Sequence, residues 1–234
     1  MRPRHDGGVG DAFETPRNAT DTRRPVAAFC VIVVTAVVAA ILTRNWEFVF
    51  HALAATAVAG VVMWTRRTIE LSPKLLWAMA LCAALHMAGG LVPVPAGWPT
   101  LGGPILYNLW IVDGWLKYDH LVHAFGFGVA AVGFWQVLLA ILPNLRPSPA
   151  PLLICWIAAQ GCGALNEIAE FAAVRMFEKT NVGDFENAML DLLSNAVGAG
   201  AAIVAIALVA WRRRLRSQPS RVATQRWSGQ TSAA

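Results

Sequence analysis

Residues 118–128, YDHLVHAFGFG, place one aspartate and two histidines at the start of a long uncharged run. Asp119 and His123 stand four residues apart, so a helix would bring both side chains to one face. A carboxylate beside an imidazole can bind a metal ion or pass a proton. The spacing therefore indicates a chemical site at the edge of this apolar segment, with His120 next to it.

Other ionisable and amide side chains gather at the ends of three further apolar segments. His86 lies in CAALHMAGG, and Glu167 and Glu170 lie in GALNEIAEF. The segment NVGDFENAMLDLLSN adds a further set, which consists of Asp184, Asn187, Asp191 and Asn195. The opposite ends of these segments hold almost no ionisable residue, so we expect the polar groups to meet on one side of the molecule.

These residue types suit a divalent metal such as zinc, which imidazole and carboxylate groups bind together. Glu167 and Glu170 are the candidate catalytic residues, acting as general bases. The spacings D-x-x-x-H and E-x-x-E are not specific, so two alternatives stay open. One is a metal-free site for catalysis or proton handling, and the other is a hydrogen-bonded network that only joins helices. The candidate metal ligands are Asp119, His123, Asp184 and Asp191, with His86, His120 and Asn195 as further candidates.

Two histidines are interpreted differently from the rest. His86 taken alone is expected to be a packed or hydrogen-bonded side chain. His51 is isolated in its apolar segment and is given no role.

The composition indicates a membrane protein. Hydrophobic residues make up 56% of the 234 residues and charged residues only 14%, against about 25% charge in a typical soluble domain. The net charge of +5 does not indicate a nucleic-acid partner, because the lysines and arginines lie in tails and short loops. The four cysteines fall in apolar runs without a C-x-x-C pair, which favours small buried side chains over redox sites.

Six apolar segments each come close to the about 20 residues that cross a bilayer as a helix. The predicted fold class is therefore all-α, a polytopic membrane protein with about six transmembrane helices. One membrane domain, 25–211, would lie between a disordered polar tail, 1–24, and a basic tail, 212–234. The approximate spans are 25–43, 46–64, 74–94, 120–142, 151–176 and 187–211.

The basic residues predict the orientation. With six spans, 15 of the 19 lysines and arginines fall on the side of the two tails and of the second and fourth loops. Such residues favour the cytoplasmic side, so both termini are expected in the cytoplasm. The predicted location is a bacterial cytoplasmic (inner) membrane. The loop at 95–119 would then lie outside at headgroup level, with Asp113 and Lys117 solvated in it.

Helical periodicity predicts that the polar groups face the bundle interior. Positions 119, 123, 126, 130 and 133 share one face of the fourth span, and 187, 191, 195, 198 and 202 share one face of the sixth. Both faces are polar near one end and carry small residues deeper in, and small residues let helices approach closely in lipid. An acid facing lipid at a helix centre costs about 2.5–3.5 kcal/mol. We therefore expect spans three to six to surround a polar pocket.

The order of these motifs resembles the YjdF-like family of bacterial inner-membrane proteins of unknown function. LHMAGG, YDHLVHAFGFG, NEIAEF and GDFENAMLDLLSNAVGA follow in the family's order across residues 45–205. The resemblance implies that Asp119, His123, the two glutamates and the last acids belong to one pattern, with Asn187 where the family has an acid. The chain also has a more distant likeness to VanZ-like membrane proteins. Both likenesses imply a membrane fold and no particular reaction.

Three functions fit these observations. The first is an intramembrane enzyme, a metal-assisted hydrolase or transferase acting on a lipid-linked or envelope substrate. The second is a small transporter coupled to protons or cations, and the third is a scaffold with a structural polar network. Transport needs a polar path through the inner side as well, where the sequence has few polar residues, so the transporter is the less favoured of the three. The expected partners are membrane lipid and that substrate, with no nucleic acid, and the oligomeric state stays open.

Overall fold

The computed structural model describes residues 20–178 and 180–217, and six long helices account for most of them. Each helix is long and apolar enough to cross a membrane, which confirms the predicted all-α class with six spans. The predicted tails, 1–24 and 212–234, lie largely outside the described residues. The helices are α1 (Thr20–Leu42), α2 (Trp46–Thr65), α3 (Pro73–Leu91), α4 (Tyr118–Ile141), α5 (Pro149–Met176) and α6 (Phe185–Ser217).

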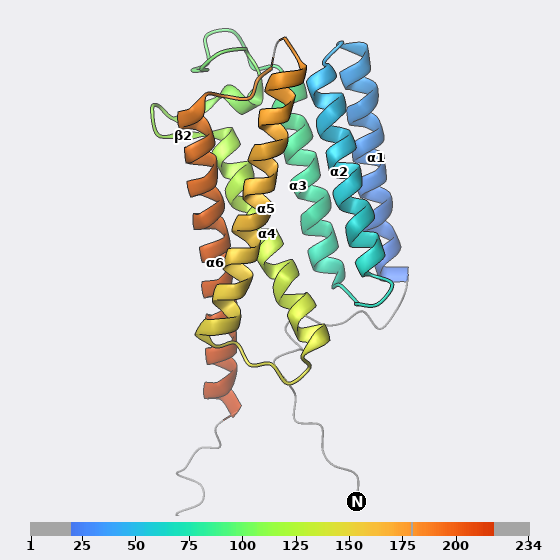
Figure 1. Ribbon diagram of the computed structural model, residues 1–234, viewed down its shortest axis with the longest axis vertical. Coiled ribbons are helices and arrows are strands. Elements are labelled where there is room, and N and C mark those ends of the chain that lie inside the picture. Colours follow the sequence, from blue (N-terminus) through green and yellow to red (C-terminus); the bar gives the residue numbers. More distant parts are fainter. Residues whose placement is uncertain (1–19, 179, 218–234) are drawn as a thin grey trace, which may run out of the picture.

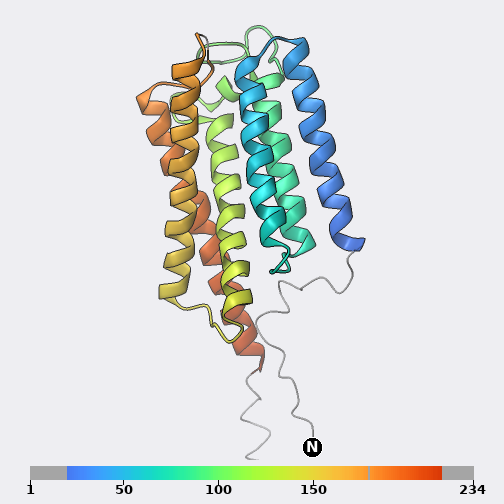
Figure 2. The same cartoon turned by 45° about the vertical axis from the view of Figure 1, so that its right-hand side comes forward.

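The six helices form two groups of three. Helices α1–α3 make one group and α4–α6 the other, and α3 and α4 are in contact where the groups meet (Figure 1). The turned view keeps this order, with α1 at one edge and α5 and α6 at the other (Figure 2). We call the end that carries the 92–117 connection the upper end. Helix α1 begins and α6 ends at the lower end, and its assignment to the cytoplasm remains a prediction from the basic residues.

Side-chain caps begin two of the helices. The Asn45 side chain accepts a hydrogen bond of 3.2 Å from the Phe48 N–H at the start of α2. The Ser72 side chain accepts one of 3.3 Å from the Leu75 N–H at the start of α3. Such caps satisfy N–H groups that the first helical turn leaves without a partner. Asn45 and Ser72 thereby determine where α2 and α3 begin.

The connection between α3 and α4 is folded rather than irregular. It contains a 3-10 turn, η2 (Leu106–Asn108), and an antiparallel hairpin of β1 (Trp110–Val112) and β2 (Leu116–Lys117). The turn packs against both α3 and α4. As a result Tyr107 and Lys117 are buried, although the sequence predicted that Lys117 is solvated.

The closest helix approach is between α4 and α6. A methyl group on Gly198 would overlap the carbonyl oxygen of Ala124, and one on Gly128 would lie 3.1 Å from the Gly198 oxygen. The predicted face of α4 differs at Gly126, which instead approaches the Cys82 sulfur of α3. Helix α4 lies between two neighbours, so it uses small residues on two faces instead of one.

Candidate functional site

Acidic and imidazole side chains from α4, α5 and α6 meet near the upper end of the bundle. At their centre is His123, which is 5% exposed. Its Nε2 lies 3.6 Å from Asp119 Oδ1 and 3.9 Å from Glu170 Oε1, and its Nδ1 lies 3.8 Å from Glu167 Oε1. We call Asp119, His123, Glu167, Glu170 and Asp191 the acidic cluster.

Two overlapping sets of potential ligands share the imidazole of His123. One set is Asp119, His123 and Asp191, and the other is His123, Glu167 and Glu170; within each, one ligand atom per residue lies within 4.8 Å of the others. Helical spacing explains each pair on one element, because residues three or four apart lie on the same face. The contact between α4 and α6 adds Asp191, and the contact between α4 and α5 adds the glutamates.

Asn195 of α6 orients the central imidazole. Its Oδ1 lies 3.1 Å from His123 Nδ1, and the residue is fully buried. An amide oxygen can only accept a hydrogen bond, so His123 Nδ1 is protonated and is the donor. In the neutral ring Nε2 then keeps its lone pair, which faces Asp119 and Glu170. Gly163 of α5 leaves room for this amide, since a methyl group there would lie 2.6 Å from Asn195 Nδ2.

A second amide, Asn187, joins the carboxylates of α4 and α6. Its Nδ2 donates to Asp191 Oδ2 at 2.6 Å and to Asp119 Oδ2 at 3.4 Å. Its Oδ1 accepts from the ammonium group of the buried Lys117. The position where the YjdF-like pattern has an acid therefore holds a neutral group that bridges two acids and a lysine.

His120 faces the cluster from the first turn of α4. Its Nδ1 accepts the Lys117 backbone N–H at 3.2 Å, so the neutral ring carries its proton on Nε2. That nitrogen lies 4.0 Å from Asp191 Oδ1. Neither atom has a hydrogen-bond partner within the described residues, although both side chains are almost completely buried.

Asp184 does not join the acidic cluster. It is exposed, and its Oδ1 accepts a hydrogen bond of 3.0 Å from the Asn187 backbone N–H at the start of α6. Its observed contact is that of a helix cap.

Comparison with known proteins identifies the family of this chain. Residues 24–214 match the family described as predicted membrane protein, DUF2238. The chain belongs to this family. It is the YjdF-like family that the order of the motifs resembled. The chain matches no curated protein and no solved structure. Membership in DUF2238 therefore supports a multi-pass membrane protein and carries no reaction with it.

This DUF2238 chain holds a second polar group that the sequence did not predict. His51 of α2 and His86 of α3 have ring centroids 5.3 Å apart, and the Tyr107 hydroxyl is hydrogen-bonded to His86 Nδ1. Burial raises the pKa of Tyr107 well above its usual value, and the negative charges of Asp119 and Glu170 raise that pKa further. The phenol therefore stays protonated and donates a hydrogen bond to His86 Nδ1.

The glycine pair of LHMAGG is the sequence signal that could have revealed this group. A methyl group on Gly89 would lie 2.6 Å from the Tyr107 ring, and one on Gly90 would overlap the Phe48 ring. The pair therefore admits two aromatic rings beside His86. The sequence alone does not identify these rings, because Tyr107 and Phe48 come from distant segments.

Proposed function

We propose that the acidic cluster binds a divalent transition-metal ion and uses it in a hydrolytic or group-transfer reaction. The site would work from the outer side of a bacterial cytoplasmic membrane, on a lipid-linked or envelope substrate. Asp119, His123 and Asp191, whose ligand atoms lie within 4.8 Å of one another, hold the ion in this proposal, with Glu170 as a further ligand. Glu167 is the general base.

The tautomer and surroundings of His123 carry the proposal. A histidine that binds a metal through one nitrogen usually donates its other N–H to an orienting acceptor, and Asn195 is such an acceptor at 3.1 Å. Nε2 then faces two carboxylate oxygens at 3.6 and 3.9 Å. Ligand atoms about 2.0 Å from a tetrahedral ion lie about 3.3 Å apart. Small movements would therefore close the shell around an ion.

The balance of charge supports the same conclusion. Four carboxylates meet in this small region, and the ion pairs that they form in the described part of the chain all involve histidine. The nearby Lys117 ammonium contacts Asn187 instead. Carboxylates confined together in a low dielectric repel one another unless protons or a cation neutralise them. The fully buried Asp191 keeps one oxygen without a hydrogen-bond partner among the described residues, as an oxygen that awaits a cation would.

The two glutamates differ in their surroundings. Glu170 accepts a hydrogen bond of 2.7 Å from Asn166. This bond would hold the carboxylate in position as a ligand. Glu167 Oε1 has no such partner within the described residues, and this side chain is 13% exposed. This oxygen is itself buried, 3.8 Å from His123 Nδ1, and a carboxylate oxygen without a hydrogen-bond donor is free to accept a proton as a general base. A divalent ion in the cluster would supply Lewis-acid chemistry toward a substrate oxygen.

The interior below the cluster favours an enzyme over a transporter. Ala131, Ala159 and Ala199 are fully buried against one another there, and Trp135 fills the next layer. These apolar side chains offer no polar path toward the lower end. The exposed edge of the cluster is formed instead by Asp119, Glu167 and Glu170, whose side chains are 11–16% exposed. A reactant would therefore approach and leave on the same side.

Metal content is the direct test. The full chain, purified in detergent, is stripped with a chelator, loaded with zinc or manganese, and measured by elemental analysis after removal of free ion. The wild type is expected to retain about one ion per chain. Asp119→Asn removes one ligand charge from the cluster, and Asp113→Asn makes the same change in the exposed hairpin turn. We expect Asp119→Asn to lose the ion and Asp113→Asn to retain it.

A third variant separates a metal enzyme from a metal-stabilised scaffold. Glu167→Gln keeps the shape of the side chain and should retain the ion. It should also abolish the hydrolytic or transfer activity of the loaded wild type in a screen of lipid-linked esters and amides. Equal metal content in wild type, Asp119→Asn and a metal-free control would overturn the proposal.

A further inference from the structure

The lower end of α2 carries a groove that is remote from the acidic cluster. It encloses about 510 Å³ and is lined by Gly60, Met63, Trp64, Arg66 and Arg67. This volume falls within the range of about 300–1,000 Å³ that is common for ligand sites. Gly60 helps to create the space, because no atom lies within 4 Å of the position that a Cβ would take there.

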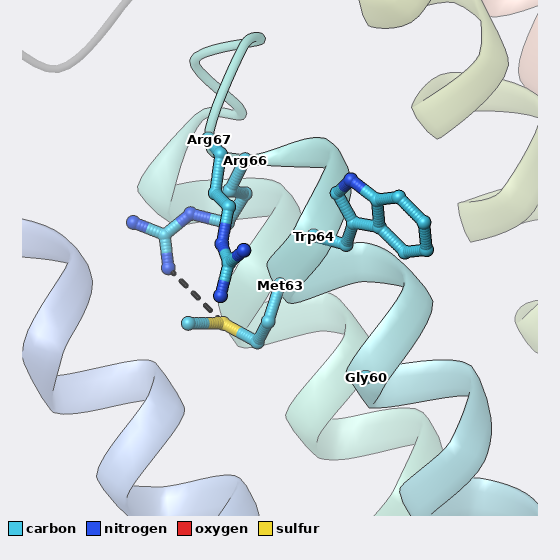
Figure 3. A pocket seen from close by; sticks show the side chains of 5 residues that line it. All are labelled: Gly60, Met63, Trp64, Arg66 and Arg67. Atoms are coloured by element: carbon cyan, nitrogen blue, oxygen red, sulfur yellow. Dashed lines mark hydrogen bonds between the residues drawn. The ribbon is translucent and has the colours of Figure 1, made fainter.

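Two guanidinium groups stand together in this groove. Figure 3 shows both of them beside the Met63 thioether, with the Trp64 indole on another side of the helix end. Arg66 donates to Met63 Sδ at 3.5 Å, and a thioether is a weak acceptor. Within residues 20–178 and 180–217, neither arginine forms an ion pair with a carboxylate. Most of their N–H donors are therefore available to an anion, and phosphate matches the fork geometry of guanidinium.

The surface beside the arginines is apolar and faces outward. Trp64 is 73% exposed, Val61 is 64% exposed and Val58 is 60% exposed on the same helix. Tryptophan favours the headgroup level of a membrane, and the exposed valines continue from it along the span. A ligand that satisfies both surfaces carries a phosphate at one end and apolar chains at the other.

We propose that this groove binds the phosphate of an anionic phospholipid, with the acyl chains along the exposed face of α2. Basic pockets at helix ends bind lipid headgroups through the same combination of charge and apolar surface. The groove would hold this lipid in place at the lower end of the bundle. The proposal does not depend on a metal ion or on a reaction at the acidic cluster.

Native mass spectrometry of the full chain in detergent, titrated with phosphatidylglycerol, tests this proposal. The Arg66→Gln/Arg67→Gln double variant should lose at least about tenfold in affinity for the first bound lipid, from two lost charge contacts. The matched control is Arg146→Gln/Arg212→Gln, which removes two exposed charges from the same end. It should change the affinity less than about twofold, because neither arginine lines the groove. Because Arg67 is exposed and the Arg66 side chain, among the described residues, donates only to the Met63 thioether, both double variants are expected to fold.

Two further titrations identify the ligand. Phosphatidylcholine should bind more weakly than phosphatidylglycerol, and inorganic phosphate should not displace the bound lipid. Equal affinity for the two lipids, or an equal loss in both double variants, would show that the groove does not recognise an anion. Complete displacement by inorganic phosphate would overturn the lipid as the ligand.

Discussion

The upper and lower parts of α4, α5 and α6 are built differently, although the same three helices form both. The upper part holds the acidic cluster, with Asp191 and Asn195 fully buried. The lower part is packed with Trp135, Cys155 and Ile206, and small alanines lie between the two parts. Small and apolar side chains suffice to associate helices in lipid. Helix association therefore does not require the polar upper part, and its desolvation cost is one reason for the proposal that it has a chemical role.

A polar contact with a structural role is present in the same molecule for comparison. At the lower end Gln136 Oε1 accepts the Ser72 N–H at 2.9 Å, and Gln136 Nε2 donates to Ser72 Oγ at 2.9 Å. This pair is neutral, reciprocal and buried. The acidic cluster has instead ionisable groups at 3.6–4.0 Å and atoms without partners among the described residues. This difference is what the proposal of a ligand site at the acidic cluster would lead us to expect.

The largest predicted effect is on the crossing of α4 and α6. Gly198→Val places a side chain into the Ala124 carbonyl, which cannot rotate away, and we expect a loss of more than about 3 kcal/mol of stability. Gly161→Val is the matched control, because no atom lies within 4 Å of its Cβ position. Size-exclusion chromatography and thermal unfolding in detergent should show aggregation or early unfolding for Gly198→Val alone. Similar unfolding of both variants would mean that α4 and α6 do not cross here.

The next effect concerns the support of the central imidazole. Gly163→Ala pushes against the Asn195 amide, a flexible side chain, so the fold should persist while His123 loses its orientation. Loss of such a supporting contact typically lowers metal affinity by about 10–100-fold. Calorimetric titration with zinc measures this change, with Gly161→Ala on the same helix as the control. An unchanged zinc affinity in Gly163→Ala would show that Asn195 does not support metal binding by the acidic cluster.

A smaller effect is expected at the structural polar pair. Gln136→Leu leaves the Ser72 N–H and hydroxyl without their partner, which costs about 1–3 kcal/mol. Metal content should not change, because the pair lies far from the acidic cluster along α4. Chemical unfolding and elemental analysis of the same sample test both statements. Loss of the metal in Gln136→Leu would contradict the view that the Gln136–Ser72 pair is purely structural and independent of the acidic cluster.

The smallest effect is predicted for Asp184. Asp184→Ala removes the cap of α6 and should cost about 0.5–2 kcal/mol, whereas Asp184→Asn should retain most of the stability. Both variants should keep the metal, since the structure places Asp184 outside the acidic cluster. Loss of metal in Asp184→Asn would restore Asp184 to the ligand set that the sequence predicted.

The spans were predictable because a bilayer allows few solutions. An uncharged run of about 20 residues reads as a helix from one sequence alone, and the predicted 46–64 and 151–176 lie within one or two residues of α2 and α5. The folded part of the 92–117 connection was not predictable in this way. Its hairpin and its two isolated bridges join residues that no helical or strand periodicity in the sequence brings together.

The candidate site was predictable only as far as each helix alone could show it. Asp119 with His123 and Glu167 with Glu170 follow from spacing on one helix. The role of Asn195, the burial of Lys117 and the meeting of His51 with His86 depend on how separate helices rotate against each other. That rotation is set by close contacts such as Gly198 with Ala124, and one sequence does not encode it as a readable pattern.

The complete burial of Asp191 and Asn195 has a consequence for biogenesis. Helix α6 follows α4 and α5 in the chain, and on its own in lipid it would expose Asp191 in its second turn; an acid costs about 2.5–3.5 kcal/mol at a helix centre. If the helices insert in chain order, α4 and α5 would be present first, with His123, Gly128 and Gly163 on the faces that α6 and its side chains contact. Asp191 and Asn195 would then be buried against these helices instead of facing lipid.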